Sequence, residues 1–272
     1  MTKPHYLQFL KDSGLIVTTL EGVDIPIWEL SVPSDDDPCL KDWAKRFRQN
    51  YCLDDEIDEM RDGTELSRSE YLLSYCFPDS SAAPGPSVRS GDFAELVISD
   101  YVEHLLGYWV PRGKYGEKES RDESAKGVDI IGFKVVEAGV PNLQDELLTY
   151  EVKAQFTEKT YNKRLQTAID DSQKDFVRSG ISLNAAKRRF VKAKDKEKVA
   201  LISRFQNIAD RPFILKFGAA AILSGKAFDA SKLRETRAKD HPHNHTLQTI
   251  VIKGSGLMAL THALYQRAAD EA

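Results

Sequence analysis

The sequence has few cysteines, no long apolar run and no glycine-rich phosphate loop. Its three cysteines, Cys39, Cys52 and Cys76, are odd in number and lack metal-type spacing, so we expect free thiols in a reducing cytoplasm. No stretch approaches the roughly 20 apolar residues that span a bilayer, and the first residues lack the apolar segment of a signal peptide. We therefore expect a cytoplasmic chain with no membrane partner. Because no Walker pattern is present, we do not expect the chain to hydrolyse ATP.

The net charge of −4 at pH 7 hides a strong asymmetry along the chain. Residues 1–110 hold 9 basic and 21 acidic side chains, whereas residues 151–240 hold 21 basic and 11 acidic ones. A basic middle could follow a phosphate backbone, and an acidic front could face a partner or the basic half. Two solvated faces of opposite sign explain the same pattern equally well.

The clearest break in the sequence is residues 79–87, Asp-Ser-Ser-Ala-Ala-Pro-Gly-Pro-Ser, whose composition is typical of a linker. Before it, short strand patterns at residues 15–17 and 25–30 precede several amphipathic helical pieces. We therefore predict a small N-terminal α/β extension over residues 1–85 and a main domain over residues 86–272.

The main domain alternates between helical and strand patterns, which predicts an α/β fold with a mixed central sheet flanked by helices. The expected elements, in order, are a helix at 90–105, strands at 108–110, 127–133 and 148–156, helices over 158–205 with a break near Ser179-Gly180, strands at 212–220 and 249–252, and a closing helix at 256–269.

Charged residues interrupt the apolar strand at 148–156 on one face only. In 148–156 the side chains alternate, so that Tyr150 and Val152 share one face while Glu151 and Lys153 share the other. Asp129 lies in the preceding strand. Charged side chains in so apolar a strand are costly to bury unless a bound metal or substrate interacts with them. The alternation therefore predicts a functional site at this face.

These residue types suit metal-dependent attack on a phosphodiester. Asp129, Glu151 and the carbonyl group of Val152 could supply the hard oxygen ligands that Mg²⁺, or Mn²⁺, prefers. Lys153 could steady the charge that develops on the attacked phosphate and orient or activate a water molecule. The alternative interpretation is an exposed ion pair on an edge strand.

A glutamate-bearing helix, an Asp strand and a Glu-x-Lys strand, in this order, resemble the PD-(D/E)XK nuclease superfamily. Val128 stands where the superfamily has its proline, a substitution that the superfamily often tolerates. Gln155 matches an additional glutamine of some branches. The resemblance implies a restriction-endonuclease-like core and a catalytic set made of Glu95, Asp129, Glu151 and Lys153.

Three short motifs are similar to the HamA family, the nuclease subunit of the Hachiman anti-phage defence system. They are Gly-Asp-Phe-Ala-Glu at 91–95, Gly-Val-Asp-Ile-Ile-Gly-Phe at 127–133, and Glu-Val-Lys at 151–153 before a long helical insert. The resemblance implies a nuclease that a helicase subunit, HamB, restrains until DNA damage or phage replication is sensed.

A basic segment follows the motif strands, and Phe190 is its only interleaved aromatic residue. Such a segment suits sequence-independent contact with DNA phosphates, although a solvated helix face would have the same composition. The candidate DNA contacts are Lys187, Arg188, Arg189 and Lys192, together with Gln155.

The histidines are not expected to form a metal site. His241, His243 and His245 lie in a loop with proline and asparagine and no nearby fourth ligand, which is typical of a surface turn. His104 lies within the apolar arc of the helix at 90–105, so we expect a buried histidine with a satisfied hydrogen bond.

The sequence as a whole predicts a metal-dependent, sequence-nonspecific DNA endonuclease that acts in defence beside a helicase. The same sequence is compatible with two alternatives. One is a DNA-binding or scaffolding subunit with a vestigial nuclease site, and the other is a site-specific restriction enzyme.

Overall fold

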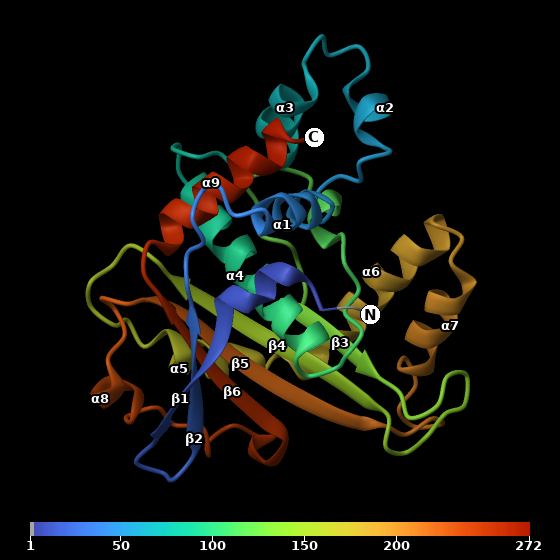
Figure 1. Ribbon diagram of the computed structural model, residues 1–272. Coiled ribbons are helices and arrows are strands. Elements are labelled where there is room, and N and C mark those ends of the chain that lie inside the picture. Colours follow the sequence, from blue (N-terminus) through green and yellow to red (C-terminus); the bar gives the residue numbers. More distant parts are fainter. Residues whose placement is uncertain (1–2) are drawn as a thin grey trace.

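A mixed sheet of six strands forms the centre of the computed structural model, which describes residues 3–272 (Figure 1). The strand order is β1-β2-β6-β5-β4-β3. Strands β2, β6, β5 and β4 run parallel, whereas the outer strands β1 and β3 are antiparallel to their neighbours. This arrangement confirms the predicted α/β class. The strands are β1 Leu10–Thr18, β2 Asp24–Leu30, β3 Ile130–Lys134, β4 Glu146–Gln155, β5 Ile214–Ser224 and β6 Leu247–Gly254.

Helices cover both faces of this sheet. Apolar side chains of α1, α4 and α9 form one cluster with Tyr150 and Val152 of β4, and those of α5 pack on the opposite face against Ala219 and Ala221 of β5. The hairpin of α6 and α7 covers β3 and the start of β4 on that opposite face. No helix among residues 3–272 is long and apolar enough to cross a membrane.

The helices have the following bounds: α1 Cys39–Arg48, α2 Ile57–Arg61, α3 Arg68–Tyr71, α4 Gly85–His104, α5 Arg164–Ser172, α6 Asp175–Lys192, α7 Lys196–Arg204, α8 Ala230–Leu233 and α9 Leu257–Asp270. Short 3₁₀ segments occupy His5–Phe9, Lys114–Glu117 and Asn244–Thr246, and a π-helical turn occupies Leu72–Cys76.

The N-terminal segment is part of the same sheet and core, so the predicted boundary between residues 85 and 86 does not divide the fold. Strand β2 pairs in parallel with β6, and Tyr6 and Leu7 share the large apolar cluster with Phe93 and Tyr150. The proline- and glycine-rich stretch leads directly into α4, with a proline in its first turn. Proline and glycine mark a turn into a helix as readily as a linker. Residues 1 and 2 of the predicted extension lie outside the described residues.

Two further expectations differ from the structure. The stretch at 108–110 makes only an isolated bridge, between Trp109 and Phe133. Helix α6 continues through Gly180, where the sequence predicts a break. The helical structure is interrupted instead at residues 173–174 and 193–195. A solvent-facing glycine costs a helix only about 1 kcal/mol. The burial of Leu183 and Ala186 further along α6 offsets this cost.

Gly218 on β5 makes room for the largest side chain on the neighbouring strand. It pairs with Tyr150, which is fully buried on β4, and a Cβ atom at Gly218 would lie 2.3 Å from the tyrosine ring. We expect Gly218→Ala to lower the free energy of unfolding by about 1–3 kcal/mol, because an overpacked core must shift. Urea denaturation measures this change.

Gly180→Ala is the matched control for that experiment. Gly180 is an exposed glycine within α6, and a Cβ atom there would meet nothing within 4 Å. We expect this variant to be as stable as the wild type or more stable, by up to about 1 kcal/mol. Equal loss of stability in both variants would contradict the packing argument for Gly218.

Candidate active site

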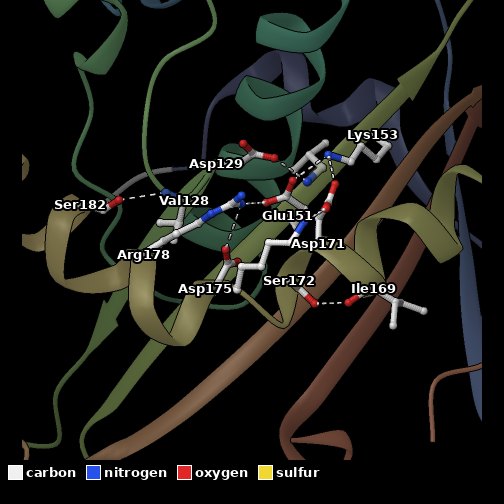
Figure 2. Close-up of polar contacts among 12 residues, drawn as sticks. Val128, Asp129, Glu151, Lys153, Ile169, Asp171, Ser172, Asp175, Arg178 and Ser182 are labelled. Atoms are coloured by element: carbon white, nitrogen blue, oxygen red, sulfur yellow. Dashed lines mark hydrogen bonds and ion pairs between the residues drawn. The ribbon is translucent and has the colours of Figure 1, made fainter. Parts of the chain in front are cut away.

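The structure brings Asp129, Glu151 and Lys153 together at the face of the sheet that α5 and α6 cover (Figure 2). Ile130 pairs with Tyr150, so continuing this register places Asp129 opposite Glu151. The backbone N–H of Val152 donates a hydrogen bond of 2.8 Å to Asp129 Oδ2. The period-two alternation of β4 therefore delivers its charges to one face, as the sequence predicts.

Lys153 is held between two carboxylates. Its Nζ atom lies 2.7 Å from Glu151 Oε1 and 3.0 Å from Asp171 Oδ2, at the end of α5. Burial lowers the pKa of Lys153, but the hydrogen bond and charge of Glu151 outweigh it and raise that pKa above its ordinary value. Lys153 is consequently a fixed positive charge at neutral pH, suited to stabilising negative charge rather than accepting a proton.

Two carboxylates beside Lys153 have oxygens without a hydrogen-bond partner. Glu151 is 4% exposed and its Oε2 atom has no partner, while Asp175 at the start of α6 is fully buried and both of its oxygens lack one. Burial, followed by the charge of Glu151, raises the pKa of Asp175 to about 7. Buried oxygens in this condition are costly, and a divalent cation is a fitting partner for them.

Asp129 lies where negative charge is concentrated. Burial, then the charges of Glu95 and Glu151, raise the pKa of Asp129 well above its ordinary value, and Lys114 opposes this shift. A cation beside Asp129 and Glu151 would relieve both the desolvation and the repulsion. These two residues therefore fit the predicted metal site, with water molecules completing the coordination as Mg²⁺ usually requires.

Glu95 reaches the site indirectly. It lies on α4, where Tyr115 Oη donates a hydrogen bond of 2.8 Å to Glu95 Oε2 and Lys114 forms an ion pair with the same carboxylate. Lys114 also donates to the backbone carbonyl of Asp129. Glu95 is therefore linked through Lys114 to the backbone carbonyl of Asp129, and this link holds the backbone at Asp129 in place.

The acidic residues of the site do not converge as tightly as another group in the molecule. Among residues 3–272, three His, Cys, Asp or Glu side chains place ligand atoms within 4.8 Å of one another only at Asp100, Glu103 and His104. That group is already paired with Arg112, whose Nη2 atom lies 2.8 Å from Asp100 Oδ1 and 2.5 Å from Glu103 Oε2. A cation at the candidate site would rely on two carboxylates rather than three.

Helix α6 also fixes the segment that carries Asp129. Ser182 Oγ accepts a hydrogen bond of 2.9 Å from the backbone N–H of Val128. Gly127 has a φ of +103°, and a Cβ atom there would lie 2.4 Å from Ser182 Oγ. This glycine is therefore required for the close approach of α6 to the strand.

The predicted DNA contacts divide into two groups. Gln155 is 3% exposed, and its amide fastens the loop after β4 through the Thr160 carbonyl and the Asn162 N–H. Gln155 therefore serves that loop and is not a surface for DNA. Arg189 is committed to Glu117 at 2.8 Å and Lys187 to Gln206 at 2.8 Å, whereas the side chains of Arg188 and Lys192 are exposed on α6.

The surface-turn prediction is wrong for one of the three loop histidines. His241 is 1% exposed, lies 3.2 Å from Ser172 Oγ through Nε2, and packs with His243 against the ring of Phe217. Burial against an aromatic residue 24 positions earlier is not encoded in the local pattern. His245 is exposed, as expected.

Two other expectations hold. The side chain of His104 is buried and its Nε2 atom lies 3.2 Å from Arg46 Nη2, which satisfies it as predicted. Cys39, Cys52 and Cys76 are free thiols.

The fold and site define an α/β protein with a carboxylate-and-lysine centre on one face of a mixed sheet. A family model described as HamA matches residues 4–268, so the chain belongs to the HamA family. This membership confirms the resemblance of the three short motifs to HamA and identifies a component of the Hachiman anti-phage defence system. Comparisons with curated proteins and with solved structures found no match.

Proposed function

We propose that this protein is a Mg²⁺-dependent, sequence-nonspecific DNA endonuclease with a PD-(D/E)XK-type centre. The observation that carries the proposal is the buried Glu151 on the strand next to Asp129: its Oε1 atom lies 2.7 Å from Lys153 Nζ, and its Oε2 atom has no hydrogen-bond partner. A carboxylate oxygen that is buried without a hydrogen-bond partner is costly, and a bound cation would offset that cost.

Each residue has a defined part in this reaction. Asp129 and Glu151 would hold the ion, which supplies Lewis-acid chemistry when bound. Lys153, fixed by Glu151 and Asp171, presents its positive charge where the phosphate becomes more negative. The exposed Arg188 and Lys192 on α6 provide phosphate contacts that carry no sequence information.

The direct test is incubation of the purified protein with several unrelated supercoiled plasmids and Mg²⁺. We expect nicking and then a smear of fragments from every plasmid, and we expect EDTA to stop the reaction. A fixed fragment pattern would instead indicate a site-specific restriction enzyme. Retained DNA binding without cleavage in Mg²⁺ or Mn²⁺ would indicate the vestigial alternative.

The family membership supports a helicase subunit as the partner that restrains this nuclease. The addition of that subunit is expected to suppress cleavage of intact plasmid DNA. An unchanged cleavage rate in a stable complex of the two subunits would contradict restraint.

A further inference from the structure

Two buried carboxylates face one another across an arginine at the start of α6. Asp175 is the first residue of α6 and is fully buried, and neither of its oxygens has a hydrogen-bond partner. Glu151 on β4 is 4% exposed and its Oε2 atom lacks a partner as well. Three buried oxygens are thus left without a donor on this side of Glu151.

Arg178 lies between these two carboxylates without satisfying either (Figure 2). Its Nη1 atom is 3.9 Å from Glu151 Oε2 and 4.0 Å from Asp175 Oδ1, which is too far for hydrogen bonds. The side chain is 37% exposed, so it has a route to solvent. Arg178 therefore supplies positive charge at this position but not the direct ligation that the oxygens lack.

The energetics favour a ligand over a purely structural ion pair. A buried carboxylate is stable when it is both paired and hydrogen-bonded, and a pair at 4 Å with orphaned oxygens meets only the first condition. Hard oxygen donors of this kind, with water in the remaining positions, are what Mg²⁺ and Mn²⁺ select. The acidic residue at the helix start gains some stability from the helix dipole, but far less than a bound dication would supply.

We propose that Glu151 and Asp175 form a second divalent-cation position, on the α6 side of Glu151 and distinct from the position at Asp129. In the absence of the ion Arg178 stands in for it, and it turns toward solvent when the ion enters. The proposal deepens the proposed function, since Glu151 would then serve two ions of one centre. It also assigns α6 a direct part in the chemistry.

The test is the number of Mn²⁺ ions bound per chain, measured by equilibrium dialysis, together with the melting temperature in EDTA. We expect two ions for the wild type and one for Asp175→Asn. The melting temperature of Asp175→Asn in EDTA should equal or exceed that of the wild type, because a buried unsatisfied charge is removed. Unchanged Mn²⁺ stoichiometry together with a lower melting temperature would show a structural role and overturn the proposal.

Asp170→Asn is the matched control, since Asp170 is an exposed carboxylate on α5 that contacts Gln166. This variant should bind two ions like the wild type. If Asp175→Asn fails to fold, Arg178→Gln replaces it as the test. Removal of the competing positive charge should raise the affinity for the second ion roughly tenfold, and an unchanged or lower affinity would overturn the proposal.

The outcomes separate this inference from the proposed function. If the wild type binds one ion that Asp129→Asn removes and Asp175→Asn does not, the second position is refuted and the nuclease centre stands. If the bound ion is lost in Asp175→Asn but kept in Asp129→Asn, the result supports the second position and contradicts a metal site at Asp129. If no ion binds, the second position is refuted, and the plasmid assay alone decides the proposed function.

Discussion

Replacing Lys153 with methionine is expected to slow DNA cleavage by roughly 10²–10³-fold, the usual effect of removing one preorganised charge that stabilises a transition state. Methionine keeps most of the length and apolar body of the side chain, so the loss isolates the charge. Lys153 Nζ lies 2.7 Å from Glu151 and 3.0 Å from Asp171, and the raised pKa keeps it protonated. Single-turnover cleavage of a labelled duplex in Mg²⁺ measures the effect.

Lys174→Met is the control for this result. Lys174 also contacts Asp171, at 2.7 Å, but its side chain is 59% exposed. Its loss should change the rate by no more than about twofold, as is usual for an exposed ion pair. A folded Lys153→Met variant that cleaves at the wild-type rate would remove Lys153 from the mechanism.

The second large effect is expected from Asp129→Asn, which should abolish both cleavage and the stabilisation of the protein by Mg²⁺. The asparagine is nearly isosteric and can still accept the hydrogen bond from the Val152 N–H through its amide oxygen. It cannot supply the negative charge that a divalent ion requires. Without metal the variant should melt no lower than the wild type, because burial and the neighbouring Glu95 and Glu151 disfavour the charged form of Asp129.

Thermal melting with Mg²⁺ and with EDTA measures this prediction. Asp100→Asn is the control, because Asp100 belongs to the tight acidic group that pairs with Arg112. This control should have a lower melting temperature than the wild type in EDTA, but Mg²⁺ should still raise its melting temperature. If the rise in melting temperature with Mg²⁺ disappears in Asp100→Asn and persists in Asp129→Asn, the ion binds at the group around Asp100. That result would contradict the proposed chemistry.

The local sequence predicts the strand residues of the site because their placement follows from backbone geometry. A period of two sets Glu151 and Lys153 on one face, and an adjacent strand sets Asp129 beside them. Asp171, Asp175 and Arg178 were missed because they reach the site from helices whose docking depends on tertiary packing.

One signal could have found Asp175. The buried face of α6 contains Asp175, Ser179, Leu183 and Ala186, so a carboxylate begins an otherwise small and apolar helix face. A charged residue at such a position is unusual unless it is paired or ligated. The pattern becomes visible only once the helix is known to start at Asp175 and to continue through Gly180.

The role of the N-terminal segment was hidden for a related reason. Its two short strands follow from the local pattern, but the pairing of β2 with β6 joins Ile27 to Val251, more than two hundred residues apart. No local composition encodes such a parallel pairing, whereas the proline- and glycine-rich stretch is conspicuous. The sequence therefore indicated a division where the sheet is continuous.

We propose that Asp129 and Glu151 hold a divalent ion beside Lys153. The most direct measurement is an anomalous difference map from crystals of the protein soaked in Mn²⁺. We expect a manganese peak in contact with the carboxylates of Asp129 and Glu151. A map with no peak there, or with its only peak at Asp100, Glu103 and His104, would contradict it.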